Sequence, residues 1–368
     1  MKIAFDYQIF FLQEYGGISR YYSYLAEYLN ATQDTEARIF AGLHINDYLS
    51  SLPAGIVKGY DVRNRHRSKK LFRMINNIMS GYQMKHFKPD VVHKTYFFGN
   101  TPAPKGTPCV VTVYDMIHER FSDLFPRNDQ TSHMKEEAVK NADHVICISK
   151  STQRDLIRFF NTPEQKTSVI YLGFKEFDLG ENNMNLPLAP AEKPYFLYVG
   201  QRSAYKNFSN FIQAFAASPE LKRDFNVVCF GGGEFHAAET NIFMKLGLND
   251  SQVMHIGGGD GNLSNCYKNA FAFVYPSLYE GFGIPPLEAM SLDCPVICSN
   301  TSSIPEVVAE SAEYFDPADI DSIRKSLERI AGSADRRDEL VRQGKARLLE
   351  FTWEKCARET RTIYGNIT

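Results

Sequence analysis

Two carboxylates, Glu280 and Glu288, stand eight positions apart across a glycine turn and a proline pair. Gly281 and Gly283 allow the backbone to turn sharply and to approach a ligand closely, because glycine has no Cβ. The prolines at 285–286 suit the first positions of a helix, whose free N–H groups favour phosphate. We expect Glu288 in the first turn of that helix and Glu280 on the loop before it. The pattern predicts an anion site with two carboxylates that bind sugar hydroxyls. Its ordinary alternative is a loop in which the glutamate complements the helix dipole.

A second group of chemistry-bearing residues follows the predicted strand 195–199, in the sequence GQRSAYKNF. Arg202 and Lys206 fall on the loop between this strand and the next helix. Two cations at such a place can neutralise a departing diphosphate. An isolated pair with this spacing is more often a pair of solvated surface charges.

The N-terminal half carries two further candidate loops. Gly16 and Gly17 lie between the first strand and the first long helix, where backbone N–H groups can face a phosphate or an acceptor oxygen. Asp115 and His118 follow the predicted strand 109–113. A lone histidine at such a position is more often structural than catalytic.

The run 275–290, YPSLYEGFGIPPLEAM, resembles the E-x7-E signature of the retaining glycosyltransferases of family 4, which use nucleotide-sugar donors. The resemblance covers nearly the whole chain and is strongest from 195 to 306. It implies that Glu288 holds the ribose hydroxyls and that Glu280 contacts the transferred sugar. It also implies that Arg202 and Lys206 stabilise the leaving diphosphate, and that the remaining donor-binding residues are Gly16, Gly17, Gly200, Ser277, Gly281, Phe282, Gly283 and Ile284.

The sequence departs from the family pattern at two places. Tyr114 stands where the family usually has a histidine close to the transferred sugar, while the following Asp115 matches. His118 is a candidate substitute for that histidine, and with Asp115 it completes the predicted catalytic set. Asp293 stands where the family tends to have glycine after a helix, so we expect a left-handed backbone there, which aspartate tolerates better than most residues.

Short β-branched runs alternate with amphipathic segments along most of the chain, which is typical of parallel sheets with crossover helices. A break in this rhythm near Gly173, followed by a polar, proline-bearing stretch at 180–190, indicates a domain linker. We expect an α/β protein with two Rossmann-like doubly wound domains, the GT-B fold that the resemblance implies. Its ligands would bind at the carboxyl ends of the strands, in the cleft between the domains. The predicted strands are 2–5, 91–93, 109–113, 144–148, 195–199, 226–230, 253–256, 271–275 and 295–299.

The expected boundaries are 1–175 for an N-terminal acceptor domain and 190–352 for a C-terminal nucleotide-sugar domain. The resemblance implies that a last helix, 353–368, crosses back onto the first domain, with Trp353 as a packing anchor. A length of 368 residues suits two domains, and a net charge of −2 gives no general case for nucleic-acid binding. The seven cysteines include no C-x-x-C pair, which favours reduced core thiols in a cytoplasmic protein.

Asp319 and Asp321 form a D-x-D pattern, but they open an amphipathic helix, where acidic residues serve the dipole. The basic pair already supplies the charge neutralisation that a metal provides, so we expect no metal and no cofactor; the nucleotide sugar is a co-substrate. No stretch approaches the ~20 apolar residues that span a bilayer. A basic amphipathic helix can lie on anionic lipid at the inner face of the membrane or can be an ordinary surface helix. Its cations are Arg63, Arg65, Arg67, Lys69, Lys70 and Arg73.

These features together predict a retaining, metal-independent hexosyltransferase. It would move a sugar, with a lean to mannose, from a GDP- or UDP-sugar to a saccharide or lipid-linked saccharide in surface polysaccharide biosynthesis. A nucleotide-sugar epimerase on the same scaffold is one alternative, which would release altered sugar without an acceptor. A non-catalytic nucleotide- or carbohydrate-binding module is another, although binding alone does not require both glutamates and both cations.

Overall fold

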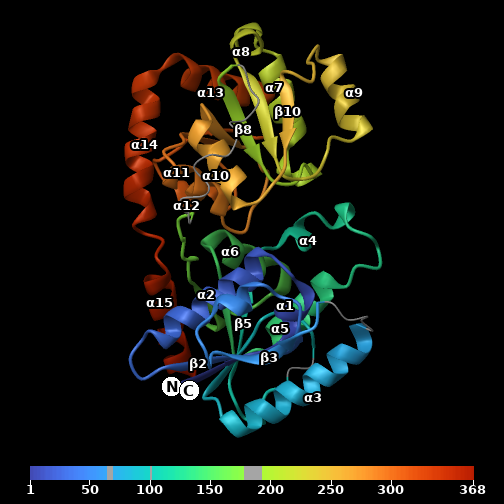
Figure 1. Ribbon diagram of the computed structural model, residues 1–368, viewed down its shortest axis with the longest axis vertical. Coiled ribbons are helices and arrows are strands. Elements are labelled where there is room, and N and C mark those ends of the chain that lie inside the picture. Colours follow the sequence, from blue (N-terminus) through green and yellow to red (C-terminus); the bar gives the residue numbers. More distant parts are fainter. Residues whose placement is uncertain (64–68, 100–101, 178–192) are drawn as a thin grey trace. The chain divides into compact units, whose positions relative to one another are not determined.

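The computed structural model describes residues 1–63, 69–99, 102–177 and 193–368. The chain divides into two compact units, shown with all elements in Figure 1. Unit 1 comprises Met1–Gly173 together with Phe351–Thr368, and unit 2 comprises Phe174–Glu350. The predicted linker at 180–190 lies outside the described residues.

Unit 1 is built on a seven-stranded, all-parallel sheet with the order β3-β2-β1-β4-β5-β6-β7. The order reverses direction between β1 and β4, which is the kind of switch point where doubly wound sheets bind ligands. The strands are β1 (Lys2–Phe5), β2 (Glu36–His44), β3 (Val57–Asp61), β4 (Val91–Lys94), β5 (Cys109–Val113), β6 (His144–Cys147) and β7 (Thr167–Val169).

The helices of unit 1 connect these strands in the usual alternation. The long helix α2 buries one apolar face, with Tyr21, Tyr22, Leu25 and Leu29 in the core. The helices are α1 (Gln8–Leu12), α2 (Gly17–Asn30), α3 (Lys69–Phe87), α4 (Ile117–Arg120), α5 (Thr131–Asn141), α6 (Lys150–Phe160) and α15 (Trp353–Ile367), with 3-10 helices η1 (Tyr48–Ser51), η2 (Ser122–Leu124) and η3 (Glu164–Lys166).

Helix α15 returns to unit 1 after the whole of unit 2 and packs on α2 (Figure 1). Trp353 is buried in this contact, and its ring lies 5.2 Å from Tyr24, 6.0 Å from Tyr21 and 6.3 Å from Tyr28. A Cβ on Gly173 would come within 2.5 Å of the Trp353 ring, so only glycine permits this approach. Trp353 is therefore a packing anchor.

Unit 2 is built on a six-stranded parallel sheet with the order β10-β9-β8-β11-β12-β13. Here the order reverses between β8 and β11. The strands are β8 (Tyr195–Val199), β9 (Asn226–Phe230), β10 (Val253–Ile256), β11 (Ala272–Tyr275), β12 (Val296–Ser299) and β13 (Glu313–Phe315).

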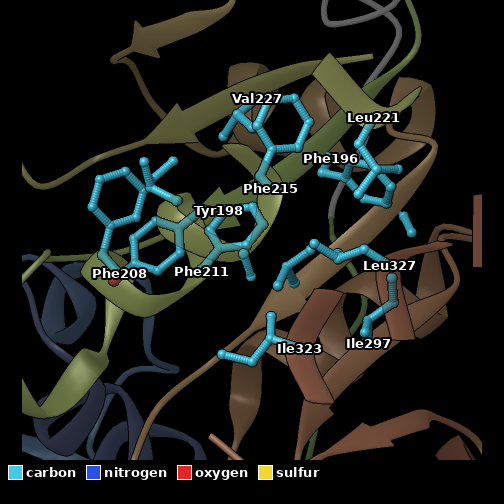
Figure 2. Close-up of a cluster of buried hydrophobic side chains, with 14 of the residues drawn as sticks. Phe196, Tyr198, Phe208, Phe211, Phe215, Leu221, Val227, Ile297, Ile323 and Leu327 are labelled. Carbon is cyan, nitrogen blue, oxygen red and sulfur yellow. The ribbon is translucent and has the colours of Figure 1, made fainter. Parts of the chain in front are cut away.

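The core of unit 2 lies between this sheet and helices such as α7 and α13, and it is rich in phenylalanine (Figure 2). Phe196 and Tyr198 of β8 pack with Phe211 and Phe215 of α7, all at most 2% exposed. The helices of unit 2 are α7 (Phe208–Ala216), α8 (Pro219–Asp224), α9 (Ala237–Lys245), α10 (Asp260–Asn269), α11 (Ile284–Ser291), α12 (Ile304–Val308), α13 (Ile320–Gly332) and α14 (Ala334–Leu348), with the 3-10 helix η5 (Ala204–Lys206).

Two local expectations have clear outcomes. Asp293 has the left-handed backbone that was predicted, with φ at 59°, and Lys345 forms an ion pair with it. The expectation that Glu288 lies in the first helical turn is wrong, because α11 begins at Ile284, ahead of both prolines, which moves Glu288 into the second turn.

Candidate active site

The two loops that carry the predicted donor residues follow β8 and β11, the strands that flank the reversal in the sheet of unit 2. The first loop leads through Gly200 to Lys206, and the second leads through Ser277 to Gly283. A backbone hydrogen bond from Leu278 N to Tyr205 O, 2.8 Å long, joins them. The fold therefore brings together segments about 75 residues apart at the edge where parallel sheets bind ligands.

Lys206 and Glu280 form an ion pair across these loops, with 2.7 Å between Nζ and Oε1. The lysine side chain is 22% exposed and the glutamate side chain 10% exposed, so the pair is mostly shielded from solvent. Aromatic rings surround the ammonium group, which lies 5.4 Å from the centre of Tyr205 and 5.9 Å from that of Tyr275. The left-handed residue Asn207 follows, and its side chain donates to Pro317 O, which fixes the backbone beside Lys206.

Three hydroxyl residues hold the backbone of the glutamate loop in place. Ser302 Oγ accepts from the Glu280 N–H at 3.0 Å. Buried Ser303 Oγ lies 2.8 Å from Glu280 O and 2.7 Å from Phe282 O, and Thr301 Oγ1 donates to Leu278 O. These side chains therefore position Glu280.

Gly283 precedes α11 with φ at 139° and ψ at 57°, a combination that L side chains rarely adopt. The eight-residue helix that follows leaves the N–H groups of Gly283 and Ile284 without intrahelical partners, and the two prolines after them have no N–H, so these two donors at the helix start favour a negative group. Ile284 is its first residue, and Phe282 and Ser277 on the preceding loop are buried. The glycine therefore allows the glutamate loop to pass directly into an anion-favouring helix start.

Glu288 lies on α11 and accepts a hydrogen bond from Tyr267 Oη at 3.1 Å. Burial, with the nearby Glu288 carboxylate as a further cause, raises the pKa of the Tyr267 phenol well above its ordinary value. Tyr267 therefore remains a neutral donor that orients the Glu288 carboxylate.

Arg202 makes several contacts within the protein that the sequence did not predict. Its side chain is 3% exposed, and its Nε donates to Glu239 Oε1 at 2.6 Å. Its other nitrogens donate to backbone oxygens of Gly231, Gly233 and Glu234 at 2.8–3.1 Å. Sequence reasoning missed Glu239, which lies on α9 outside any motif.

Gly200 begins the first loop with φ at 115°, and its N–H donates to Phe230 O at 2.9 Å. The loop after β9 packs against it, because a Cβ on Gly232 would lie 2.7 Å from Gly200 O. The loops after β8 and β9 are therefore in close backbone contact.

The predicted residues of unit 1 lie on two other loops. Gly17 is the first residue of α2, and Gly16 caps it in extended backbone with its carbonyl accepting from Arg20 N. The space around a Cβ on Gly17 is open, whereas one on Gly16 would meet the Gln13 side chain. At the start of α2, Gln13 Oε1 accepts from the Ser19 N–H at 3.3 Å, while the position beside Gly17 is open.

Asp115 follows β5, and its Oδ1 accepts from the N–H of Ile117, the first residue of α4, at 3.0 Å. Its carbonyl accepts from Lys135 Nζ at 2.9 Å, and the same ammonium pairs with Glu119 at 2.9 Å in an almost fully buried contact. This ion pair holds the Asp115 loop and was not foreseen from the sequence.

Tyr114 and His118 have separate surroundings. Tyr114 is 9% exposed and packs edge-on against Tyr21 and Tyr22 in the core, and burial raises the pKa of its phenol well above its usual range. His118 stacks on Phe125 with ring centres 4.0 Å apart, and its Nε2 lies 3.9 Å from Asp129. His118 borders a surface hollow, which Phe125, Arg127 and Asp129 also line.

Asp319 and Asp321 occupy the start of α13, where Asp319 accepts from the Asp321 N–H at 2.9 Å as an N-cap. The D-x-D pattern thus serves the helix. Within the residues that the structure describes, no group of three or more histidine, cysteine, aspartate or glutamate side chains is placed to hold a metal ion.

Comparison with known proteins places this architecture in a family. The family model described as "Glycosyltransferase Family 4" matches residues 15–175, and the one described as "Glycosyl transferases group 1" matches residues 181–347. The chain is 26% identical to the O-antigen chain mannosyltransferase B of Escherichia coli over 313 residues, which covers 80% of this chain and 78% of the relative. It is 28% identical to the O-antigen chain mannosyltransferase RfbU of Salmonella typhimurium over 60% of each chain.

Solved structures share the fold. The sucrose-phosphate synthase of Thermosynechococcus elongatus superposes with a TM-score of 0.72 at 20% identity, covering 100% of this chain and 98% of that one. WaaG, a glycosyltransferase involved in lipopolysaccharide biosynthesis, superposes at 0.69 with 14% identity, covering 98% and 99%. The predicted fold class, with two parallel α/β sheets of the GT-B type, is confirmed. The chain belongs to the family 4 glycosyltransferases.

Proposed function

We propose that this glycosyltransferase moves a hexose from a nucleotide diphosphate sugar to a saccharide or lipid-linked saccharide acceptor, with retention at the anomeric carbon. Mannose is the favoured hexose. The observation that carries the proposal is the Lys206–Glu280 pair beside the N-terminus of α11. One cation, one carboxylate and a helix start within the same loops suit a ligand with both a diphosphate and a sugar.

Each group has a task that follows from its chemistry. The ammonium of Lys206 and the N–H groups of α11 stabilise negative charge on the leaving phosphate, the electrostatic contribution that is commonly largest in catalysis. The Glu280 carboxylate accepts hydrogen bonds from hydroxyls of the transferred sugar. The Glu288 carboxylate, oriented by Tyr267, accepts from the ribose hydroxyls.

The leaving phosphate itself takes the proton of the acceptor hydroxyl in this scheme. The acceptor oxygen forms a bond to the anomeric carbon on the face from which the phosphate oxygen departs. The bond between that carbon and the phosphate oxygen breaks, and the nucleotide diphosphate leaves with its electron pair.

The names of the relatives support the choice of donor and acceptor class. Several are mannosyltransferases of O-antigen chains, and one solved neighbour is described in complex with UDP and glucose. We therefore propose surface polysaccharide as the product and GDP- or UDP-sugars as donors.

A donor panel tests this proposal. The protein is incubated with GDP-mannose, UDP-glucose, UDP-galactose, UDP-N-acetylglucosamine and dTDP-sugars, and released nucleotide is measured with and without saccharide acceptors. We expect nucleotide release that depends on the acceptor. We also expect the new linkage, read by NMR, to have the same anomeric configuration, axial or equatorial, as the sugar of the donor. Release of an altered free sugar without acceptor would instead identify an epimerase, and binding without release would identify a binding module.

We also propose that turnover needs no divalent metal and no other cofactor, because Lys206 and the helix start already offer positive charge to the diphosphate. Transfer should therefore continue in excess EDTA. Loss of turnover with EDTA, restored by Mg²⁺ or Mn²⁺, would contradict the proposal.

Helix α3 supports a further proposal, that unit 1 contacts an anionic lipid surface from the cytoplasmic side. Leu71, Met74, Ile78 and Tyr82 are 47–67% exposed, and their spacing places them on one face of the helix. Lys70, Arg73 and Lys85 supply positive charge, as in interfacial helices.

The other predicted cations contribute less to this argument. Arg63 pairs with Asp47 and Asp61, while Arg65 and Arg67 lie outside the described residues. In the part of the chain that the structure covers, no helix has the length and apolar character that a membrane crossing requires.

Vesicle flotation tests the lipid proposal. The protein should float with phosphatidylglycerol-containing vesicles and not with pure phosphatidylcholine vesicles, and Ile78→Asp should reduce flotation. The exposed Met244→Asp change on α9 is the matched control, since Met244 is also 66% exposed. If Ile78→Asp floats with these vesicles as well as the control Met244→Asp does, α3 does not bind the lipid surface.

A further inference from the structure

Arg202 and Glu239 form a nearly buried network at the carboxyl end of β8 and β9. The guanidinium donates to Glu239 Oε1 at 2.6 Å and to backbone oxygens of Gly231, Gly233 and Glu234 at 2.8–3.1 Å. The Arg202 side chain is 3% exposed and the Glu239 side chain 17% exposed. The donors of the arginine are thus directed mainly at the protein's own atoms.

We propose that Arg202 and Glu239 act as a clamp that positions the donor site: Glu239 orients Arg202, and Arg202 ties the loop after β8, which carries Lys206, to the loop after β9. In this role both are positioning residues, and neither contacts the substrate. The inference rests on the proposed function and assigns to Glu239 a part that the motifs do not indicate.

The charges support this assignment. Arg202 and Lys206 each have a carboxylate partner, but the Arg202 side chain is 3% exposed against 22% for Lys206, and its guanidinium also donates to three backbone oxygens, so Arg202 is the less available of the two cations for a diphosphate. Burial acts to raise the pKa of Glu239, but hydrogen bonds from Arg202 and from the His236 N–H outweigh it and leave the pKa lowered. Glu239 is therefore ionised at neutral pH and remains paired.

The shape of the loop after β9 explains why a clamp is needed. Gly231, Gly232 and Gly233 all have left-handed backbone, with φ at 77°, 72° and 75°. Three successive glycines lose more conformational freedom on ordering than other residues do. The carbonyl contacts from Arg202 hold this run, and aromatic Phe235 covers the guanidinium, with 4.8 Å between the Arg202 Cζ and the ring centre.

The contacts also explain why the cation is arginine. A planar guanidinium presents several N–H donors in a fixed fork, and a lysine ammonium cannot reach a carboxylate and three carbonyls in this geometry. Glu239 has two tasks, because its Oε2 also accepts from His236 N at 2.8 Å at the start of α9. Glu239 thereby links the arginine to a helix terminus.

Kinetics of four variants test the clamp: Arg202→Ala, Arg202→Lys, Glu239→Gln and the double variant Arg202→Ala/Glu239→Gln. The donor KM and kcat are measured from nucleotide release, together with the melting temperature. Loss of a hydrogen bond between charged groups leads us to expect that each single change raises the donor KM roughly tenfold or more. The double variant should be no worse than Arg202→Ala, and Arg202→Lys should not rescue.

Glu220→Gln on α8 is the matched control, because Glu220 is an exposed glutamate outside the site. The clamp is overturned if Arg202→Ala lowers kcat as Lys206→Ala does while Glu239→Gln behaves like the control, since Arg202 would then act directly on the substrate. Additive effects in the double variant would overturn it as well.

Calorimetric titration with UDP and GDP separates this inference from the proposed function. If the wild type binds a nucleotide and releases none from any sugar, the proposed function fails and the clamp is still tested through the Kd of the variants. Unchanged Kd in Glu239→Gln would then refute the clamp. Where Arg202→Ala does not fold, Glu239→Gln decides alone, because it keeps the size of the side chain and removes the charge.

Discussion

At the scale of single residues, both cations of the candidate donor site have a carboxylate partner in the ligand-free protein. Lys206 is neutralised by Glu280 and Arg202 by Glu239, at 2.7 Å and 2.6 Å. A diphosphate that reaches Lys206 must compete with Glu280, and the sugar hydroxyls can then occupy the released carboxylate. Under the proposed function, donor binding therefore exchanges one ion pair for two new sets of contacts.

The first prediction concerns Lys206→Ala. Removing a preorganised charge stabiliser commonly lowers the rate on the order of a hundredfold or more, and we expect that loss in kcat. Because the change leaves the shielded Glu280 carboxylate unpaired, the melting temperature should fall while the protein stays folded. Nucleotide release and differential scanning fluorimetry measure the two effects.

Lys245→Ala, an exposed lysine at the end of α9, is the control for this change. A folded Lys206→Ala protein with near-normal transfer would remove Lys206 from the catalytic role.

Single residues were predictable only where a motif contains them. Glu280, Glu288 and Lys206 were predicted because loop chemistry and family resemblance both indicate them. Glu239 lies 37 positions from Arg202 and Ser302 lies 22 from Glu280, and neither separation follows a local period. Such partners are set by which loops the sheet brings together, which a single sequence does not reveal.

At the scale of elements, the join between the glutamate loop and α11 depends on one backbone conformation. Gly283 has φ at 139°, and the nearest atoms to a Cβ there would be 3.8 Å away on Pro286. Space is therefore available, and conformation is the constraint. The same join places the N-terminus of α11 directly after Glu280.

The second prediction is that Gly283→Ala destabilises the protein by about 1–3 kcal/mol, the usual range for a residue forced into a sparsely populated region. Donor binding should weaken as well, since relief of the strain would displace the start of α11. Chemical denaturation and nucleotide titration measure both effects.

Gly332→Ala at the end of α13 is the matched control, because its backbone is helical and nothing lies within 4 Å of the added Cβ. Equal behaviour of the two variants would contradict the argument from φ.

Element prediction succeeded where β-branched and aromatic residues form continuous buried runs. Strands β5, β8 and β9 have the predicted bounds, and β11 and β12 differ by one residue. Strands such as β2 and β13 were not named, since the sequence EARIFAGLH and the three-residue EYF lack that composition. The start of α11 was misplaced because the proline pair suggested the first helical positions, whereas Ile284 already has helical backbone.

At the scale of the whole molecule, unit 1 is made of two segments of chain separated by all of unit 2. The later segment is held by polar as well as apolar contacts. His93 at the centre of the sheet lies 2.5 Å from Tyr364 Oη on α15 and 2.9 Å from Thr112 Oγ1. Burial lowers the pKa of His93 to about 3.

The third prediction follows from this pKa. Because the folded-state pKa lies below the ordinary 6.5, the unfolded chain binds a proton first as the pH falls. Above pH ~6.5 His93 is neutral in both states and does not lower the free energy of unfolding. Between pH ~6.5 and pH ~3 only the unfolded chain binds the proton, so the free energy of unfolding falls by up to about 5 kcal/mol. His93→Gln should therefore flatten the loss of stability in acid.

Trp353 is the sole tryptophan of the sequence and lies in unit 1, so its fluorescence reports the unfolding of that unit. Denaturation curves from pH 7 to pH 4 are compared for the wild type, His93→Gln and the exposed control His133→Gln. An unchanged pH slope in His93→Gln would show that other groups govern acid sensitivity.

The return of α15 to α2 also bears on synthesis at the ribosome. Residues 351–368 emerge only after residues 174–350, yet they cover the tyrosine face of α2 and contact His93. While unit 2 is translated, the tyrosine face of α2 in nascent unit 1 is therefore not yet covered by α15. A stop codon just before Trp353 would release a polypeptide with unit 2 encoded in full and the aromatic face of α2 uncovered, a form that chaperones and proteases would recognise.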